Sequence, residues 1–100
     1  MFPIVGGMAE TKERTPEAVR RGATIKALRE AYGLSAAKLV EPLDITRRYL
    51  SYIEAGDKLA PVALCRQIAD RLRIPLAAIL VDGVAEDYIA EAEAAKGSAA

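Results

Sequence analysis

The sequence predicts an all-α fold of five short helices followed by a sixth, C-terminal helix. Hydrophobic residues make up 52% of the chain and aromatic residues only 5%, so the core must be aliphatic. Helix start signals and glycine stop signals divide the chain into segments whose apolar residues recur at helical spacing. One hundred residues suffice for one domain with one modest core.

The first predicted helix spans residues 15–32. Thr15 can cap its N-terminus, Pro16 suits its first turn, and Glu17 is favourable to the helix dipole. Gly33 ends it. Its apolar stripe consists of Ile25, Leu28 and Tyr32.

The second predicted helix begins after Ser35, which can cap it, and runs to about Glu41. Pro42 ends this helix or distorts its last turn. Asp44 then occupies a tight turn and tolerates a left-handed conformation better than most residues. The inward side chains are Leu39, Val40 and Leu43.

The third predicted helix lies within residues 46–56. Thr46 can cap its N-terminus, and Gly56 can end it in a left-handed conformation. Leu50 and Ile53 are three residues apart and face inward. The side chains on its other faces are Arg47, Arg48, Ser51 and Tyr52. A short helix with arginines in its first turn suits insertion into a DNA major groove.

Three further helices complete the predicted fold. Pro61 starts the fourth, Pro75 starts a short fifth, and residues 84–95 form the sixth. The apolar face of the sixth helix consists of Val84, Tyr88, Ile89 and Ala92. We therefore expect an N-terminal extension over 1–14, a domain over 15–81, and an acidic helix with a frayed tail from Gly97 over 82–100.

Composition excludes several classes of protein and site. No stretch approaches the roughly 20 apolar residues that cross a bilayer. Residues 1–8 are too short and lack the positive charge for a secretory signal, so we expect a cytoplasmic protein, with Met8 a candidate internal start. Cys65 is the single cysteine and histidine is absent, which argues against a disulfide, a metal site or a catalytic centre. We expect no cofactor, no enzyme activity, and Cys65 in the core.

The net charge is zero, but it is unevenly distributed. Residues 1–81 hold 13 Lys and Arg against 9 Asp and Glu, whereas residues 82–100 hold one Lys against five Asp and Glu. A mildly basic body with an acidic tail is compatible with DNA binding.

The pattern of residues resembles the lambda-repressor-like helix-turn-helix family, also called the xenobiotic-response-element family, over about residues 22–81. The residues that carry the resemblance are Ile25, Lys26, Ala27, Leu28, Arg29, Glu30, Gly33, Leu34, Ser35, Leu39, Leu43, Ile45, Thr46, Leu50, Ser51, Ile53, Glu54, Gly56, Ile68, Ala69, Leu72, Ile74, Leu76 and Ile79. The resemblance implies that 35–41 is the positioning helix and 46–55 the recognition helix.

The resemblance also implies which residues meet DNA. The candidates for base contact are Arg47, Arg48, Ser51 and Tyr52, and further candidates for DNA contact are Thr46, Ser35, Lys38 and Tyr49. Arginine can donate two parallel hydrogen bonds to guanine, worth roughly 1–3 kcal/mol of discrimination. Family members also form a structural salt bridge at the positions of Arg29 and Glu54, which lie on the edges of inward stripes.

The chain departs from the family pattern at several positions. Ala36 replaces a glutamine that contacts DNA, Asp44 replaces a glycine in the turn, and Ala55 replaces an asparagine. The loss of the glutamine shifts the expected readout onto Arg47, Arg48 and Tyr52.

The apolar face of the sixth helix must be covered by something. We expect a homodimer that uses Leu64, Leu80, Val84, Tyr88 and Ile89. The alternative is a monomer in which this helix folds back on its own domain.

These observations favour a sequence-specific transcriptional regulator, a Cro-like repressor of phage or bacterial type that binds double-stranded DNA as a dimer. The alternative is a protein-interaction module on the same fold, such as an antitoxin or coregulator, with the acidic sixth helix as a contact surface.

Overall fold

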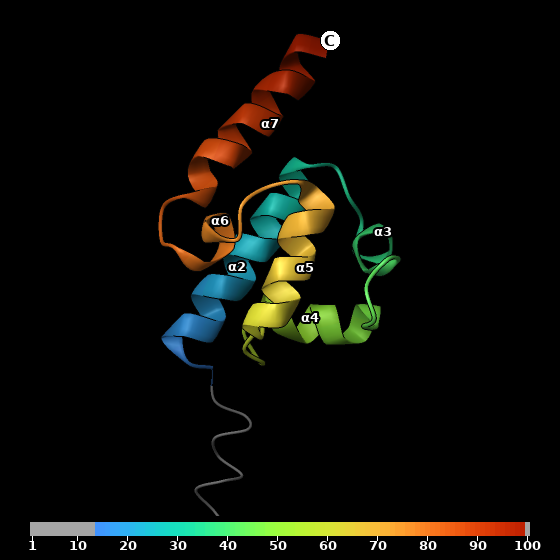
Figure 1. Ribbon diagram of the computed structural model, residues 1–100, viewed down its shortest axis with the longest axis vertical. Coiled ribbons are helices and arrows are strands. Elements are labelled where there is room, and N and C mark those ends of the chain that lie inside the picture. The colour runs from blue at the N-terminus through green and yellow to red at the C-terminus, as the bar shows by residue number, and fades with distance from the viewer. Residues whose placement is uncertain (1–13, 100) are drawn as a thin grey trace, which may run out of the picture.

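The computed structural model describes residues 14–99, which form helices and no strand (Figure 1). The predicted all-α fold is therefore confirmed. The elements are α2 (Pro16–Ala31), α3 (Ala36–Val40), α4 (Arg47–Ala55), α5 (Val62–Leu72), α6 (Ala77–Leu80) and α7 (Ala85–Ala99). The predicted N-terminal extension lies outside the described residues except for Arg14.

Three predicted N-caps are confirmed. The hydroxyl oxygen of Thr15 accepts a hydrogen bond from the backbone N–H of Ala18 at 3.0 Å. Ser35 and Thr46 cap α3 and α4 through bonds of 3.1 Å and 3.0 Å from backbone N–H groups three residues on. Each cap satisfies a donor that has no partner inside its helix.

The later helices differ in length from their predicted bounds. α6 begins at Ala77, two residues after Pro75, and has only four residues. α7 continues through Gly97 to Ala99, beyond the predicted end at residue 95. One glycine costs a helix about 1 kcal/mol, which a run of alanines can offset.

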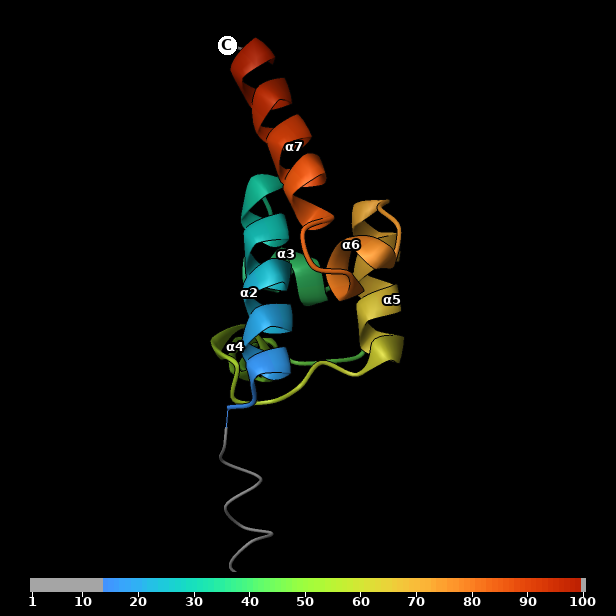
Figure 2. The ribbon, with the colours of Figure 1, turned by 90° about the vertical axis from the view of Figure 1, so that its left-hand side faces the viewer.

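α2 is the central element of the fold. It packs against α4, α6 and α7, while α3 packs on α4 and α5 packs on α6 (Figures 1 and 2). The largest fully buried side chains are Ile25, Leu28, Leu39, Leu50, Ile53, Cys65, Ile68 and Ile79. Cys65 is thus a core residue as predicted, and burial raises the pKa of its thiol. None of the helices in residues 14–99 is both long and apolar enough to span a bilayer.

Gly22 allows α2 and α4 to approach closely. A Cβ atom added at Gly22 would overlap the carbonyl oxygen of Ile53 and lie 3.2 Å from Cα of Glu54. Both atoms belong to the backbone of α4, so a side chain cannot be accommodated without displacing that helix. Gly22 therefore fixes the distance between the two helix axes.

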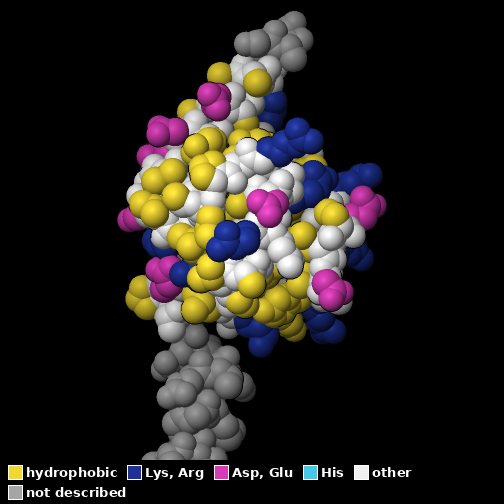
Figure 3. Space-filling model, viewed as in Figure 1, with side chains coloured by type: hydrophobic (Ala, Val, Ile, Leu, Met, Phe, Trp, Pro, Cys, Tyr) yellow, Lys and Arg dark blue, Asp and Glu magenta, His cyan; other side chains and the backbone are white. Residues whose placement is uncertain are grey.

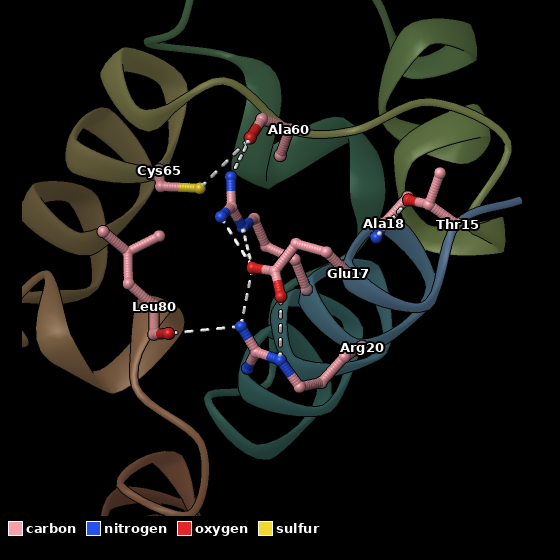
Figure 4. A network of polar contacts seen from close by, with 8 residues as sticks. Thr15, Glu17, Ala18, Arg20, Ala60, Cys65 and Leu80 are labelled. Atoms are coloured by element: carbon pink, nitrogen blue, oxygen red, sulfur yellow. Dashed lines mark hydrogen bonds and ion pairs between the residues drawn. The ribbon is translucent and has the colours of Figure 1, made fainter. Parts of the chain in front are cut away.

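A polar network ties the first turns of α2 to α6 and to the segment before α5 (Figure 4). The Glu17 carboxylate accepts hydrogen bonds from the guanidinium groups of Arg20 and Arg21 at 2.8 Å and 2.6 Å. Arg20 also donates to the carbonyl oxygen of Leu80 at 3.1 Å, and Arg21 to that of Ala60 at 2.7 Å. Arg20 thus satisfies a carbonyl group at the C-terminal end of α6, and Arg21 satisfies one in the segment before α5.

We predict that Gly22→Ala destabilises the protein by about 1–3 kcal/mol, because the added methyl group forces α4 away from α2. In an open helix the same change would stabilise by about 1 kcal/mol, so the sign of the effect is diagnostic. Ala23→Gly, at the exposed neighbouring position, is the control and should cost about 1 kcal/mol, the ordinary preference of a helix for alanine over glycine. Urea denaturation measures all three proteins, and a Gly22→Ala variant more stable than wild type would contradict the close approach.

We predict an acid-dependent contribution from Glu17. Hydrogen bonds from Arg20 and then Arg21 hold the pKa of this carboxyl below its ordinary value of 4.5. The stabilisation is therefore fully present above pH 4.5 and is lost as the pH falls through the lowered pKa of the folded protein. Thermal melts should show a difference between wild type and Glu17→Gln that is constant near neutrality and shrinks in acid. A constant difference over the whole range would contradict the assignment.

Candidate nucleic-acid interface

The candidate interface is built on α4, which has nine residues. Leu50 and Ile53 are fully buried on its inner side. Gly56 ends the helix with φ of +87°, a conformation that favours glycine. The predicted start and stop residues of this helix are therefore confirmed.

The outer side of α4 carries the residues that the resemblance nominates for base contact. Arg47, Arg48, Ser51 and Tyr52 are all exposed, and their spacing places them on one side of the helix. Tyr49 is half-buried and packs against the core. Figure 3 shows Lys and Arg side chains along the lower edge of the molecule, where α4 lies. The helix thus presents two arginines, a hydroxyl and a phenol to one side.

The candidates for backbone contact lie beside this side of α4. Ser35 and Thr46 are exposed, and their hydroxyl oxygens accept the cap bonds of α3 and α4. Each hydroxyl therefore keeps its own proton for donation to a phosphate oxygen. Lys38 is exposed on α3, which packs directly on α4. Ala36 is half-buried against the core, and its methyl side chain offers no hydrogen bond.

Arg29 and Glu54 form a bidentate ion pair between α2 and the end of α4. The Arg29 Nε–H and Nη2–H groups donate to the two carboxylate oxygens at 2.7 Å and 3.1 Å. Only 13% of the Arg29 side chain and 10% of the Glu54 side chain is exposed. The hydrogen bonds to Glu54 raise the pKa of Arg29 above its ordinary value, so the guanidinium stays charged at all physiological pH values.

The same guanidinium reaches a third element. Arg29 Nη1–H donates to the carbonyl oxygen of Leu34 at 2.9 Å, in the segment that leads into α3. One side chain therefore connects α2, the approach to α3, and the end of α4. With Gly22 beneath Ile53, this contact fixes α4 relative to α2.

The residues predicted for dimerisation lie elsewhere, and one prediction about them is wrong. Leu64 is expected from the sequence on an outer face of α5, but it is only 6% exposed and belongs to the core. The core stripe of α5 is wider than predicted, and α6 packs on this helix. Leu64 thus offers no surface to a partner.

The other four are half-buried against the core of their own chain, namely Leu80, Val84, Tyr88 and Ile89. Burial raises the pKa of the phenol of Tyr32, which directly follows α2, and Glu91 and Tyr88 on α7 add to the effect. Lys96 donates to the carbonyl oxygen of Glu30, at the end of α2, at 3.3 Å. These contacts are those of the alternative arrangement, in which the last helix folds back.

Sequence reasoning missed two features of this region. The contact of Gly22 with α4 carries a weak signal in the sequence, because a glycine within an apolar helical pattern marks a close approach. For Glu17, the sequence predicts only a favourable position at a helix start. The spacing of Arg20 and Arg21, three and four residues further along, does not reveal which carbonyl groups these arginines contact.

Comparison with known families agrees with this geometry. The family model described as helix-turn-helix domain matches residues 22–79, which include α3, α4 and the turn between them. No curated protein and no solved structure matches the chain significantly.

We predict that Arg29→Ala or Glu54→Ala costs about 3–5 kcal/mol of unfolding free energy, because each change leaves a buried charge without its partner. The double variant should cost much less than the sum of the two single variants. Arg29→Lys keeps the charge but loses the fork, and it should remain clearly destabilised. Additive effects of the two alanine substitutions, measured by urea denaturation, would contradict the importance of this pair.

Proposed function

The chain belongs to the helix-turn-helix domain family, and from that premise we propose that it is a sequence-specific transcriptional regulator of the Cro-like repressor type. The observation that carries the proposal is the outer side of α4, where Arg47 and Arg48 are exposed in the first turn. Cations are unfavourable at a helix N-terminus, so two adjacent arginines there need a compensating anionic or acceptor partner.

In the proposed complex α4 lies in the major groove. Arg47 and Arg48 donate to guanine edges or adjacent phosphates, and Ser51 and Tyr52 meet bases one turn further along. Ser35, Thr46, Lys38 and Tyr49 donate to phosphate oxygens on either side and set the register. The rigid attachment of α4 to α2 supports this arrangement, because groove reading requires fixed donors.

The distribution of charge agrees with this orientation. α7 carries acidic residues in its first turn and extends from the body at the end opposite α4 (Figure 1). DNA that meets α4 therefore stays away from the acidic helix. We propose residues 15–81 as the DNA-binding domain and residues 82–100 as an acidic appendage.

Repression would follow from occupation of promoter DNA by a dimer. Two copies related by a two-fold axis would read half-sites about 34–36 Å apart on one face of the duplex. The operator is then expected to be a near-palindrome.

A second candidate function is a protein-interaction module, such as an antitoxin or coregulator. It is favoured by the exposed acidic residues of α7, which are Glu86, Asp87, Glu91 and Glu93. A basic surface on another protein could bind there.

We predict that binding to an operator-containing fragment weakens steeply with salt, because phosphate contacts release counterions. Arg47→Ala should cost about 1–3 kcal/mol on the specific site and much less on unrelated DNA. Lys26→Ala removes an exposed cation of α2 outside the proposed site, and it should leave the specific affinity unchanged. Fluorescence anisotropy measures all three proteins. Equal losses of specific DNA affinity from Arg47→Ala and Lys26→Ala would contradict base reading by Arg47.

A further inference from the structure

A groove lies between the turn that joins α3 to α4 and the outer side of α5. Six residues line it, three from the turn and three from the helix: Pro42, Leu43, Asp44, Gln67, Asp70 and Arg71. The spacing of the three α5 residues places their side chains on one side of that helix. The groove has a volume of about 450 Å³, and clefts that hold small ligands have volumes of about 300–1,000 Å³.

The four polar side chains of this groove have no partner within the described part of the chain. Arg71 is half-buried and the other three are exposed. None of the four forms a side-chain hydrogen bond or an ion pair with a residue in 14–99, whereas Glu54 is paired through both carboxylate oxygens. Asp70 and Arg71 are adjacent in α5, and adjacent helical residues do not face each other. The groove therefore keeps its charges accessible to a ligand.

The charges in the groove define the molecule that complements them. They are two carboxylates, from Asp44 and Asp70, and one guanidinium group, from Arg71. A carboxylate binds an ammonium or guanidinium group through charge-assisted hydrogen bonds, and arginine binds a carboxylate through two parallel bonds. The complementary molecule thus has two cationic groups and one carboxylate. We propose that the groove binds a free amino acid with a cationic side chain, such as arginine or lysine.

Each part of such an amino acid has a counterpart in the groove. Its α-carboxylate meets Arg71, and its two cationic groups meet the two aspartates. The Gln67 amide both donates and accepts hydrogen bonds, so it can bind either end of the ligand. The methylene chain of the ligand lies against Pro42 and Leu43, as the stems of cationic side chains do on apolar surface.

Two other occupants complement the groove less well. Phosphate groups of DNA are disfavoured, because the two carboxylates repel them. A basic side chain of another protein has no free α-carboxylate, so it leaves the half-buried guanidinium of Arg71 without a partner. A free amino acid satisfies all three charges at once.

A ligand in this groove joins two segments that the domain does not connect by polar contacts. Within residues 14–99 no hydrogen bond or ion pair links residues 41–45 to α5, and the turn has its own backbone bond from Leu43 N–H to the carbonyl oxygen of Val40 at 2.8 Å. Asp44 precedes Thr46, the cap of α4, by two residues. The ligand therefore stabilises the folded domain by mass action, because the unfolded chain has no such groove.

Isothermal titration calorimetry of the full chain with L-arginine tests the proposal. We expect a single site with a Kd of about 1 mM or tighter. Asp70→Asn and Arg71→Gln should each weaken binding at least about tenfold, because each removes a charge-assisted contact. Both positions lie outside the buried stripe of α5, so the variants should remain folded. Asp87→Asn, the same change at an exposed position of α7, is the matched control and should bind like wild type.

Two analogues of arginine separate the charges of the ligand. Agmatine lacks the carboxylate, and citrulline has a neutral group in place of the guanidinium, so both should bind wild type at least about tenfold more weakly than L-arginine. Arg71→Gln should bind agmatine and L-arginine about equally, since the partner of the carboxylate is gone. A general effect of arginine on the solvent would not follow this pattern.

The proposal is overturned by several results. Absence of binding at about 10 mM L-arginine, or an equal Kd in wild type and Asp70→Asn, contradicts it. Equal affinities of wild type for L-arginine and agmatine also overturn it, and leave the groove to a lone cationic group, such as a basic side chain of another protein. The calorimetry uses no DNA, so this proposal does not rest on the proposed function, and either one can fail while the other stands.

Discussion

The fork of hydrogen bonds from Arg29 to Glu54 determines where α4 lies in this protein. Its distances of 2.7 Å and 3.1 Å join two side chains that are almost fully buried. The close approach at Gly22 makes this possible, because the backbones of α2 and α4 meet with no side chain between them. The ion pair sets the angle of α4 and the glycine sets its distance from α2.

This attachment accounts for how so short a helix can present a defined surface. A helix of nine residues is unstable alone, so its order must come from packing. Leu50 and Ile53 supply the buried side, and the caps at Thr46 and Gly56 fix its two ends. The exposed arginines are therefore held in position before any ligand arrives, which lowers the entropic cost of binding.

Much of this architecture is predictable from local chemistry, and the remainder depends on contacts between distant segments. Thr46 and Gly56 mark the ends of α4 because capping involves only neighbouring backbone groups. The burial of Leu64 and the carbonyl partner of Arg21 escape prediction, since both depend on contacts between segments that are distant in the sequence. Helical periodicity gives the side of a helix that is apolar, but not how much of that side its neighbours cover.

In the proposed function, a rigidly held α4 reads base pairs through its outer side. Selection of bound sequences from random double-stranded DNA by the purified full-length protein tests this most directly. We expect enrichment of a two-fold sequence with guanines in each half-site, and loss of preference at specific guanine positions when Arg47 or Arg48 is replaced by alanine. Recovery of no enriched sequence, or of one that both variants select unchanged, would contradict it.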